Sequence, residues 1–469
     1  MSEWLHDPDG FAALMPEDFT MGVATAAFQI EGAVREDGRG PSTWDTFMAQ
    51  PGRISDGSDA AVATDHYHRY SEDVSLMTEL GVDSYRFSLS WTRIQPDGTG
   101  GPNNAGVAFY DRLLDELLAA GIRPMATLFH WDMPEPLQHR GGWMTRDTAS
   151  RFADYALLAA AAFGDRVDKW VTLNEPASVT LNGYALGVHA PGATLMFDSL
   201  PSVHHQLLGH GLAVQALRSE GVTGGIGITN VHSPVEPAKD NVKTRGYAQV
   251  LDLIHNRIFA DPVLLGRYPK FPFLARKIFR PLIEVDDADL ATIAQPLDFY
   301  GLNYYMPSRV AAGPPTHDNT PDGAHSAAMR ELPFHLAAWP EFATTAFGWP
   351  IAPDYLGVTL RDYAARYGDA LPPVYITEGG ASFGDALALD GTVNDEDRVN
   401  YLADHLAVAF AGAPGLSLKG YFVWTLLDNW EWAAGFGERF GLVSVDRNTQ
   451  ERSPKRSFHW LRDVLRARR

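Results

Sequence analysis

The residue pattern predicts an α/β fold in which eight parallel strands close into one barrel with helices around it. Short runs of β-branched and aromatic residues alternate with longer segments of helical spacing almost from end to end. Residues 25–32, after the first strand, lack the glycine-rich turn with which open doubly wound sheets bind dinucleotides. No linker-like charge run or repeat of fixed period interrupts the pattern. We therefore expect a single (β/α)8 TIM barrel with long βα loops over residues 1–469.

The individual elements follow from the same alternation. The strand candidates are 21–24, 84–89, 123–128, 169–173, 226–230, 299–303, 374–377 and 421–424. The helix candidates are 65–80, 106–120, 146–163, 200–220, 251–259 with 287–294, 354–367, 395–411 and 454–468. Gly81 and Gly121 each follow a helix candidate, where a residue with positive φ ends a helix readily. Two connections, 231–249 and 306–353, exceed ordinary loop length, and such loops are usually functional.

Composition excludes several classes of function. Lys and Arg total 38 against 58 Asp and Glu, so a formal charge of −20 disfavours nucleic acid and anionic membrane surfaces as partners. The chain has no cysteine, which excludes disulfides, thiolate zinc sites and cysteine nucleophiles. No apolar run approaches the ~18 residues of a membrane span, and the first residues lack the features of a signal peptide. We expect a cytoplasmic protein.

Two glutamates follow predicted strands, at the rim where barrels carry their active sites. Glu175 lies in the run Thr-Leu-Asn-Glu-Pro at 172–176, and Glu378 lies in Ile-Thr-Glu-Gly-Gly at 376–380. Paired carboxyl groups suit glycoside hydrolysis, in which one protonates the leaving oxygen and the other attacks or activates water. Barrels also place carboxylates there to bind Mg²⁺ or abstract protons, and either glutamate alone could be a salt-bridged surface residue.

The last strand leads into a rim that is rich in tryptophan and glutamate. Trp424, Glu431 and Trp432 fall within nine residues, in the run Trp-Thr-Leu-Leu-Asp-Asn-Trp-Glu-Trp. Pyranose rings present apolar faces that stack on indole and hydroxyl groups that need acceptors. Core packing is the alternative for each tryptophan taken singly. The cluster as a whole favours a sugar site.

With these residues in place, the chain resembles glycoside hydrolase family 1, the β-glucosidase-like retaining glycosidases. The resemblance covers essentially the whole chain. Its motifs are the stretches 19–32 and 40–47, Tyr-Arg-Phe-Ser-Leu-Ser-Trp-Thr-Arg-Ile at 85–94, Phe-His-Trp at 129–131, 172–176, Gly-Leu-Asn-Tyr-Tyr at 301–305, 376–379 and 424–432.

The resemblance implies roles for individual residues. Glu175 is expected to be the general acid/base and Glu378 the nucleophile, with Arg86 next to it. The residues implied to bind substrate are Gln29, His130, Trp131, Asn174, Asn303, Tyr305, Trp424, Glu431, Trp432 and Phe440, with Trp349 on the aglycone side. Arg86 and the Tyr305 hydroxyl would favour ionised Glu378, whereas burial would keep Glu175 protonated. Asn174 is placed to donate to the sugar 2-hydroxyl.

The implied activity is an exo-acting β-glucosidase that retains configuration by double displacement, with β-fucosides and β-galactosides also accepted, in carbohydrate and cellulose breakdown. The implied partner is a small β-glycoside, and no cofactor is implied. Transglycosylation, and a sugar-binding barrel without catalysis, are the alternatives. Glu431 would repel the phosphate of a 6-phosphosugar, and Glu175 stands where thioglucosidases carry glutamine. Loop 306–353 and segment 184–192 are expected to shape the aglycone side.

A glycine beside the predicted nucleophile and a group of histidines depart from these patterns. Gly379 replaces the asparagine usual after the family's nucleophile, which puts the local hydrogen bonding in doubt. His66, His68, His204, His205 and His210 are close in sequence, but they lack a metal-ligand spacing such as His-Glu-x-x-His. We expect these histidines to be solvated or hydrogen-bonded, and we expect no metal site.

Overall fold

Eight parallel strands close into a barrel in the order β1-β11-β10-β7-β5-β4-β3-β2, which confirms the predicted (β/α)8 TIM barrel. The structure is a computed structural model that describes residues 3–314, 332–385 and 392–468. The barrel strands are β1 Thr20–Ala24, β2 Ser84–Ser88, β3 Arg123–Phe129, β4 Lys169–Asn174, β5 Gly225–Val231, β7 Phe299–Asn303, β10 Val374–Gly379 and β11 Leu418–Trp424. Each strand candidate matches one of them to within three residues at either end.

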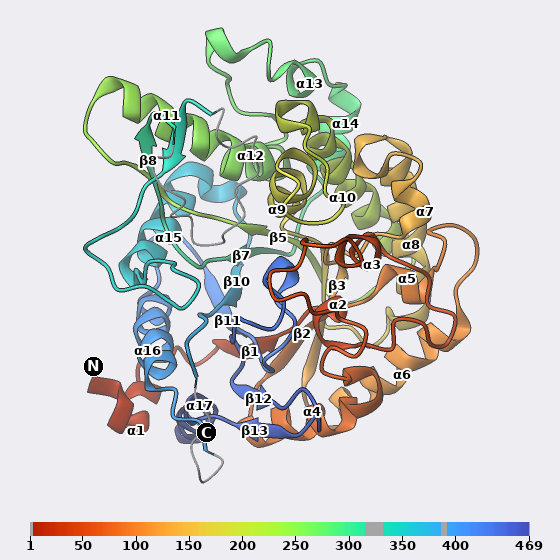
Figure 1. The fold of residues 1–469 in the computed structure, drawn as a ribbon, viewed down its shortest axis with the longest axis vertical. Coiled ribbons are helices and arrows are strands. Elements are labelled where there is room, and N and C mark those ends of the chain that lie inside the picture. Colours follow the sequence, from red (N-terminus) through yellow and green to blue (C-terminus); the bar gives the residue numbers. More distant parts are fainter. Residues whose placement is uncertain (1–2, 315–331, 386–391, 469) are drawn as a thin grey trace.

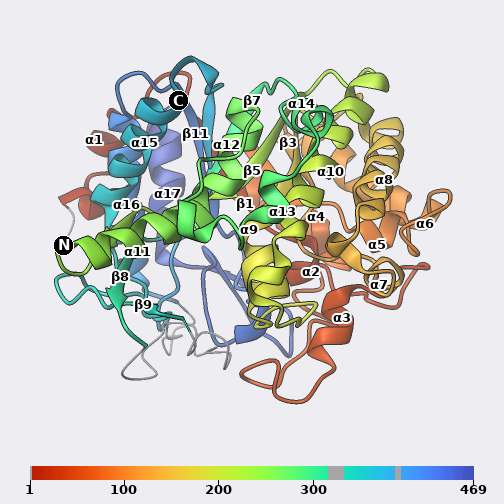
Figure 2. The same cartoon turned by 90° about the horizontal axis from the view of Figure 1, so that it is seen from above.

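Helices cover the barrel on its outside. In Figure 1 and Figure 2, α8 (Asp147–Phe163) and α10 (Pro201–Ser219) lie on one side of the strands, and α15 (Pro353–Tyr367) and α16 (Glu396–Ala411) on the other. The other longer helices are α4 His66–Leu80, α6 Asn104–Ala119, α11 Val242–Asp252, α12 Ile258–Leu265, α14 Asp287–Ile293 and α17 Arg456–Ala467. The short helices are α1 Pro8–Ala12, α2 Ala27–Ile30, α3 Thr43–Met48, α5 Trp91–Ile94, α7 Glu135–Gln138, α9 Pro176–Ser178 and α13 Arg280–Ile283, with π-helical turns η3 Val179–Ala185 and η5 Leu253–Arg257.

Burial on both faces explains why the barrel strands are easy to recognise. Every residue of β1, β2 and β7 is buried, as expected for parallel strands that pack against the barrel interior on one face and against helices on the other. Gly81 and Gly121 take positive φ values of 81° and 73° after α4 and α6, as predicted. No helix of the described residues is long and apolar enough to cross a membrane.

Three predicted boundaries are wrong. The connection 231–249 is not a continuous loop, because it holds β6 (Val235–Pro237) and the start of α11, whose first turn is capped by the Asn241 side chain. The candidate 251–259 is not one helix but the end of α11, the turn η5 and the start of α12. The last helix begins at Arg456 rather than 454, because Pro454 pairs with Val443 in a two-stranded ribbon of β12 (Val443–Val445) and β13 (Arg452–Pro454).

The second long connection builds one wall of the barrel mouth. Within 306–353, β8 (Ser308–Ala312) and β9 (Phe334–Leu336) form a small sheet with β6, in the order β6-β8-β9. Residues 315–331 of this connection lie outside the described residues. The sheet stands beyond the carboxyl ends of β5 and β7 and therefore borders the rim at which barrel enzymes bind substrate.

Candidate active site

The two predicted glutamates lie at the carboxyl ends of their strands. Glu175 directly follows β4 with a left-handed backbone (φ 47°), and α9 begins at the next residue, Pro176. Glu378 is the penultimate residue of β10, paired in register with Asn303 of β7. Both carboxyl side chains are buried, with residue exposures of 5% and 3%. Two carboxyl groups that the sequence separates widely thus share one rim.

Glu378 receives a hydrogen bond on each of its carboxyl oxygens. Arg86 Nη1, from β2, donates to Oε1 at 2.5 Å, and the Tyr305 hydroxyl donates to Oε2 at 2.7 Å. Arg86 is itself 1% exposed, so this ion pair is shielded from water. Burial, and then the negative charge of Glu378, raise the pKa of Tyr305 well above its usual value, so the phenol keeps the proton that it donates. The guanidinium and the phenol thus both direct donors at the carboxyl oxygens of Glu378.

Glu175 has a different environment. Asn303 Nδ2 donates to Oε1 at 2.7 Å, and the Ser178 hydroxyl donates to Oε2 at 2.7 Å. Burial, reinforced by the charge of Glu378, nevertheless raises the pKa of Glu175 to about 7. The two hydrogen bonds and Arg86 oppose that rise. Glu175 is therefore substantially protonated near neutral pH, as the sequence argument expected from burial.

Asn174 connects Arg86 and Asn303, the residues that donate to Glu378 and to Glu175. Its Oδ1 accepts from Arg86 Nη2 at 2.6 Å and from Asn303 Nδ2 at 3.1 Å, and its Nδ2 lies 3.0 Å from His130 Nε2. Burial lowers the pKa of His130 well below its usual value, so the neutral ring accepts at Nε2 and carries its proton on Nδ1. The Trp131 indole donates to the Asn174 carbonyl at 3.0 Å. Three neighbours, Arg86, Asn303 and His130, thus fix the orientation of the side-chain amide, and the Trp131 indole holds the backbone of the same residue.

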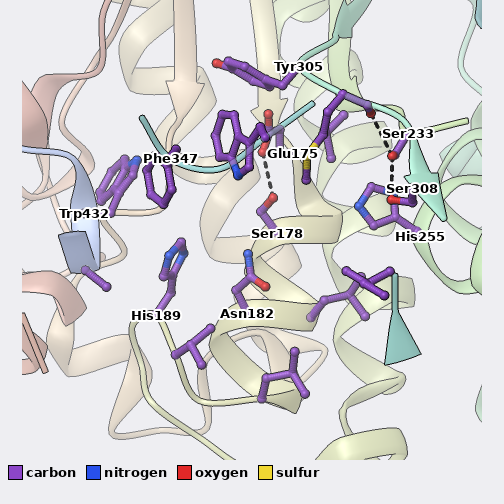
Figure 3. Close-up of a pocket in the computed structure, with 18 of the residues that line it drawn as sticks. Glu175, Ser178, Asn182, His189, Ser233, His255, Tyr305, Ser308, Phe347 and Trp432 are labelled. Atoms are coloured by element: carbon purple, nitrogen blue, oxygen red, sulfur yellow. Dashed lines mark hydrogen bonds between the residues drawn. The ribbon is translucent and has the colours of Figure 1, made fainter. Parts of the chain in front are cut away.

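The predicted residues meet at one cavity of about 1080 Å³ at the barrel mouth, part of which Figure 3 shows. Its lining includes Glu175, Glu378, His130, Trp131, Tyr305, Trp349, Trp424, Glu431, Trp432 and Phe440. Four predicted residues are not part of the lining: Arg86, Gln29, Asn174 and Asn303. Three of them donate hydrogen bonds to lining residues, Arg86 to Glu378, Gln29 to Glu431 and Asn303 to Glu175. Asn174 accepts hydrogen bonds from Arg86 and Asn303. Residues 185–189 and several described residues of 306–353 also line the cavity, so both segments border the space in which the prediction puts the aglycone.

Glu431 is held at the tryptophan-rich end. Gln29 Nε2 donates to Glu431 Oε2 at 3.0 Å, and burial raises the pKa of Glu431 to about 8. Trp432 packs against Trp131 and Trp44, each with ring centroids 4.6 Å away, so it serves the core as well as the cavity wall. The core interpretation of this tryptophan is therefore correct, and its position in the cavity wall is compatible with the predicted contact to a sugar.

Two features of the site were not predicted from the sequence. Ser178 has a recognisable signal, because it lies three residues after Glu175, one turn along a helix. Tyr421, on β11, explains Gly379: a Cβ at position 379 would fall 2.2 Å from the Tyr421 hydroxyl. The phenol occupies the space that a larger residue would need. Glu378 keeps two donors without a neighbouring asparagine.

The clustered histidines are engaged elsewhere. His66 Nδ1 lies 2.7 Å from Asp73, His204 Nε2 lies 3.0 Å from Asp289, and His210 Nδ1 lies 2.6 Å from the Thr172 hydroxyl. His68 is exposed and contacts Asp65, and His205 contacts the Trp143 carbonyl. Within the described ranges, no group of three or more His, Asp or Glu side chains has the arrangement of a metal site.

Comparison with known proteins gives consistent matches over nearly the full length. The model of the family described as glycosyl hydrolase family 1 matches residues 11–469. The chain is 41% identical to beta-glucosidase A of Thermotoga maritima over 452 residues, 96% of this chain and 97% of that protein. It is 41% identical over 465 residues to a bifunctional beta-D-glucosidase/beta-D-fucosidase of Bifidobacterium breve, covering 96% and 98% of the two chains. The crystal structure of the psychrophilic beta-glucosidase BglU of Micrococcus antarcticus superposes with a TM-score of 0.91 at 41% identity, covering 98% and 99% of the two chains.

Proposed function

This chain belongs to glycosyl hydrolase family 1, and we propose that it uses Glu378 as nucleophile and Glu175 as general acid/base to hydrolyse terminal β-D-glucosyl residues with retention. The observation that carries this proposal is the contrast between two buried carboxyl groups at one cavity. Glu378 faces a guanidinium and a phenol, whereas burial holds the pKa of Glu175 at about 7. Different environments give two carboxyl groups different roles.

In the first step, ionised Glu378 attacks the anomeric carbon while Glu175 protonates the departing glycosidic oxygen. A covalent glycosyl-enzyme forms, and the Glu378 carboxylate loses its charge. Since that charge raises the pKa of Glu175, the pKa falls once the ester has formed. Glu175, left as a carboxylate by the first step, then accepts a proton from the water that releases the sugar. The same group acts as acid and then as base.

The sugar is held at the end that contains Trp424, Glu431 and Trp432. The indole of Trp424 supplies an apolar wall, and Glu431 accepts from sugar hydroxyls. Gln29 Oε1 and His130 Nδ1 are buried without a partner in the described chain, and buried polar atoms are ordinarily paired. We expect glucosyl hydroxyls to satisfy them. The relative from Bifidobacterium breve is named for both β-glucosidase and β-fucosidase activity, which favours acceptance of fucosides here.

A 6-phosphosugar fits this end poorly. Among the described residues of the cavity wall, the arginines are Arg53 and Arg309. Arg53 donates to the Gly187 carbonyl, and Arg309 lies over the Trp339 ring and pairs with Glu341. A phosphate dianion at the sugar end would therefore meet Glu431 rather than a free cation.

The test compares three variants with the parent protein on 4-nitrophenyl β-D-glucoside and on alkyl β-D-glucosides. Glu378→Gln is expected to lose at least about a thousandfold in kcat, because no covalent intermediate can form. Glu175→Ala is expected to slow alkyl glucosides far more than nitrophenyl ones, and azide should restore its turnover. The matched control is Glu451→Gln, which alters an exposed glutamate. Near-parent activity of Glu378→Gln, or an α-anomer as first product by NMR, would refute the proposal.

A further inference from the structure

The cavity continues past the two glutamates into a part that we name the far lobe, defined by Ser233, Leu251, Ile254, His255, Met306 and Ser308. Ser233 lies two residues beyond the end of β5, and Met306 and Ser308 follow β7. Because β5 lies between β4 and β7 in the barrel, the far lobe opens next to Glu175. Figure 3 shows Ser233, Ser308 and His255 together on the side of Glu175 away from Trp432.

The far lobe is unlike the sugar end in its chemistry. The carboxyl groups of the described cavity wall are Glu175, Glu378 and Glu431, and none of them is among the residues that define the far lobe. Leu251, Ile254 and Met306 give the far lobe an apolar wall. A second glucosyl ring needs acceptors for several hydroxyls, whereas an aromatic ring gains about 25 cal/mol for each Å² of apolar surface that it buries. The wall favours an aromatic group.

The polar end of the far lobe presents acceptors only. The Ser233 hydroxyl lies 2.9 Å from the Met306 carbonyl and 2.7 Å from the Ser308 hydroxyl. A carbonyl only accepts, so Ser233 donates to Met306 and Ser308 donates to Ser233. Each hydroxyl has one hydrogen, and Ser308 has then used its own. Its oxygen remains available as an acceptor.

The hydrogen bonds of His255 likewise leave it with a free acceptor. Asn256 Oδ1 accepts from the Ser233 amide at 3.2 Å and lies 2.9 Å from His255 Nδ1. Nδ1 therefore carries the imidazole proton, and Nε2 keeps its lone pair. Burial lowers the pKa of His255 below its usual value, so the ring stays neutral at neutral pH. Two acceptors side by side match a hydroxyl donor.

We propose that the far lobe binds the aromatic aglycone of an aryl β-glucoside that carries a free hydroxyl group remote from the glycosidic bond. That hydroxyl donates to Ser308 Oγ or His255 Nε2. The inference rests on the proposed function, because the aglycone extends from a glucosyl ring held beside Glu175 and Glu378. The cavity volume of about 1080 Å³ lies just above the usual range of about 300–1,000 Å³ for ligand pockets, so the cavity holds more than one sugar ring.

The test uses the β-glucosides of 4-phenylphenol and of 4,4′-dihydroxybiphenyl, whose leaving groups are matched and which differ in one remote hydroxyl. One net hydrogen bond corresponds to a kcat/KM about fivefold higher for the hydroxylated substrate. Both should exceed cellobiose. The variants Ser308→Ala and Ser308→Ala/His255→Phe should bring the ratio toward one. Ser55→Ala alters an exposed serine of the same cavity that is not part of the far lobe, and this matched control should keep the ratio.

The outcomes separate the two proposals. A parent ratio of one, a double variant that keeps the parent ratio, or a preference for cellobiose would overturn the far-lobe assignment alone. Absence of turnover of 4-nitrophenyl β-D-glucoside by the parent protein would overturn the proposed function instead. If the double variant does not fold, the ratio of the parent protein and the ratio of Ser308→Ala still test the far-lobe assignment.

Discussion

Replacement of Ser178 by alanine should move the basic limb of the pH profile to higher pH. The Ser178 hydroxyl donates to Glu175 Oε2 at 2.7 Å, and a donor stabilises the charged carboxylate. Without it, the protonated form of Glu175 is relatively more stable, so its pKa rises from about 7. Because Glu175 must be protonated for the first step, activity then persists to higher pH.

The size of the shift follows from the hydrogen bond. A hydrogen bond to a charged group is worth about 1.5–3 kcal/mol, and one pKa unit corresponds to about 1.4 kcal/mol. Ser178 is only partly buried and lines the cavity, where water can take the place of its hydroxyl. We therefore expect the lower end of the range, a shift of about one unit, which places the basic limb near pH 8. Asn303 still donates to Oε1, so the shift is limited.

The assay is kcat/KM for 4-nitrophenyl β-D-glucoside between about pH 5 and pH 10, since kcat/KM reports the free enzyme. Ser178→Thr keeps a hydroxyl and should restore the parent profile, and Ser55→Ala should leave it unchanged. A basic limb that stays in place or moves to lower pH in Ser178→Ala would show that this hydroxyl does not set the pKa of Glu175.

Three other predictions concern neighbouring groups. Arg86→Met leaves buried Glu378 without its cation and should lower the free energy of unfolding, measured in urea, by about 3–5 kcal/mol. A loss under about 1 kcal/mol would contradict a buried ion pair. Gly379→Ala should cost about 1–3 kcal/mol by overpacking, and Tyr421→Phe in the same chain should recover part of it; strictly additive losses would exclude the contact. Glu431→Gln should raise KM for glucosides and also stabilise the fold increasingly as pH rises from 4.5 to about 8. The pKa of Glu431 in the folded protein lies above its usual value, so ionisation of Glu431 costs the parent protein no more than about 4 kcal/mol of stability over this pH range. An equal stability difference between variant and parent at pH 4.5 and at pH 8 would contradict this reasoning.

The sequence by itself determined the barrel and the identity of the rim residues. Each barrel strand is buried on both faces, so its apolar run is a local signal, and the residue after a parallel strand lies on the rim wherever its partners are. Glu175 and Glu378 were placed on this ground alone. Helix α11 was missed because its partly exposed face gives little apolar contrast; its first residue, Val242, is 81% exposed.

Only the tertiary structure decided what those residues do to one another. Arg86, Asn303 and Glu378 come from three different strands, and their hydrogen bonds join residues far apart in the chain. The pKa of Glu175 depends on burial and on the distance to another carboxylate, and neither is encoded in a local run of residues. The space that Tyr421 takes beside Gly379 and the acceptors of the far lobe likewise exist only after distant segments have packed together.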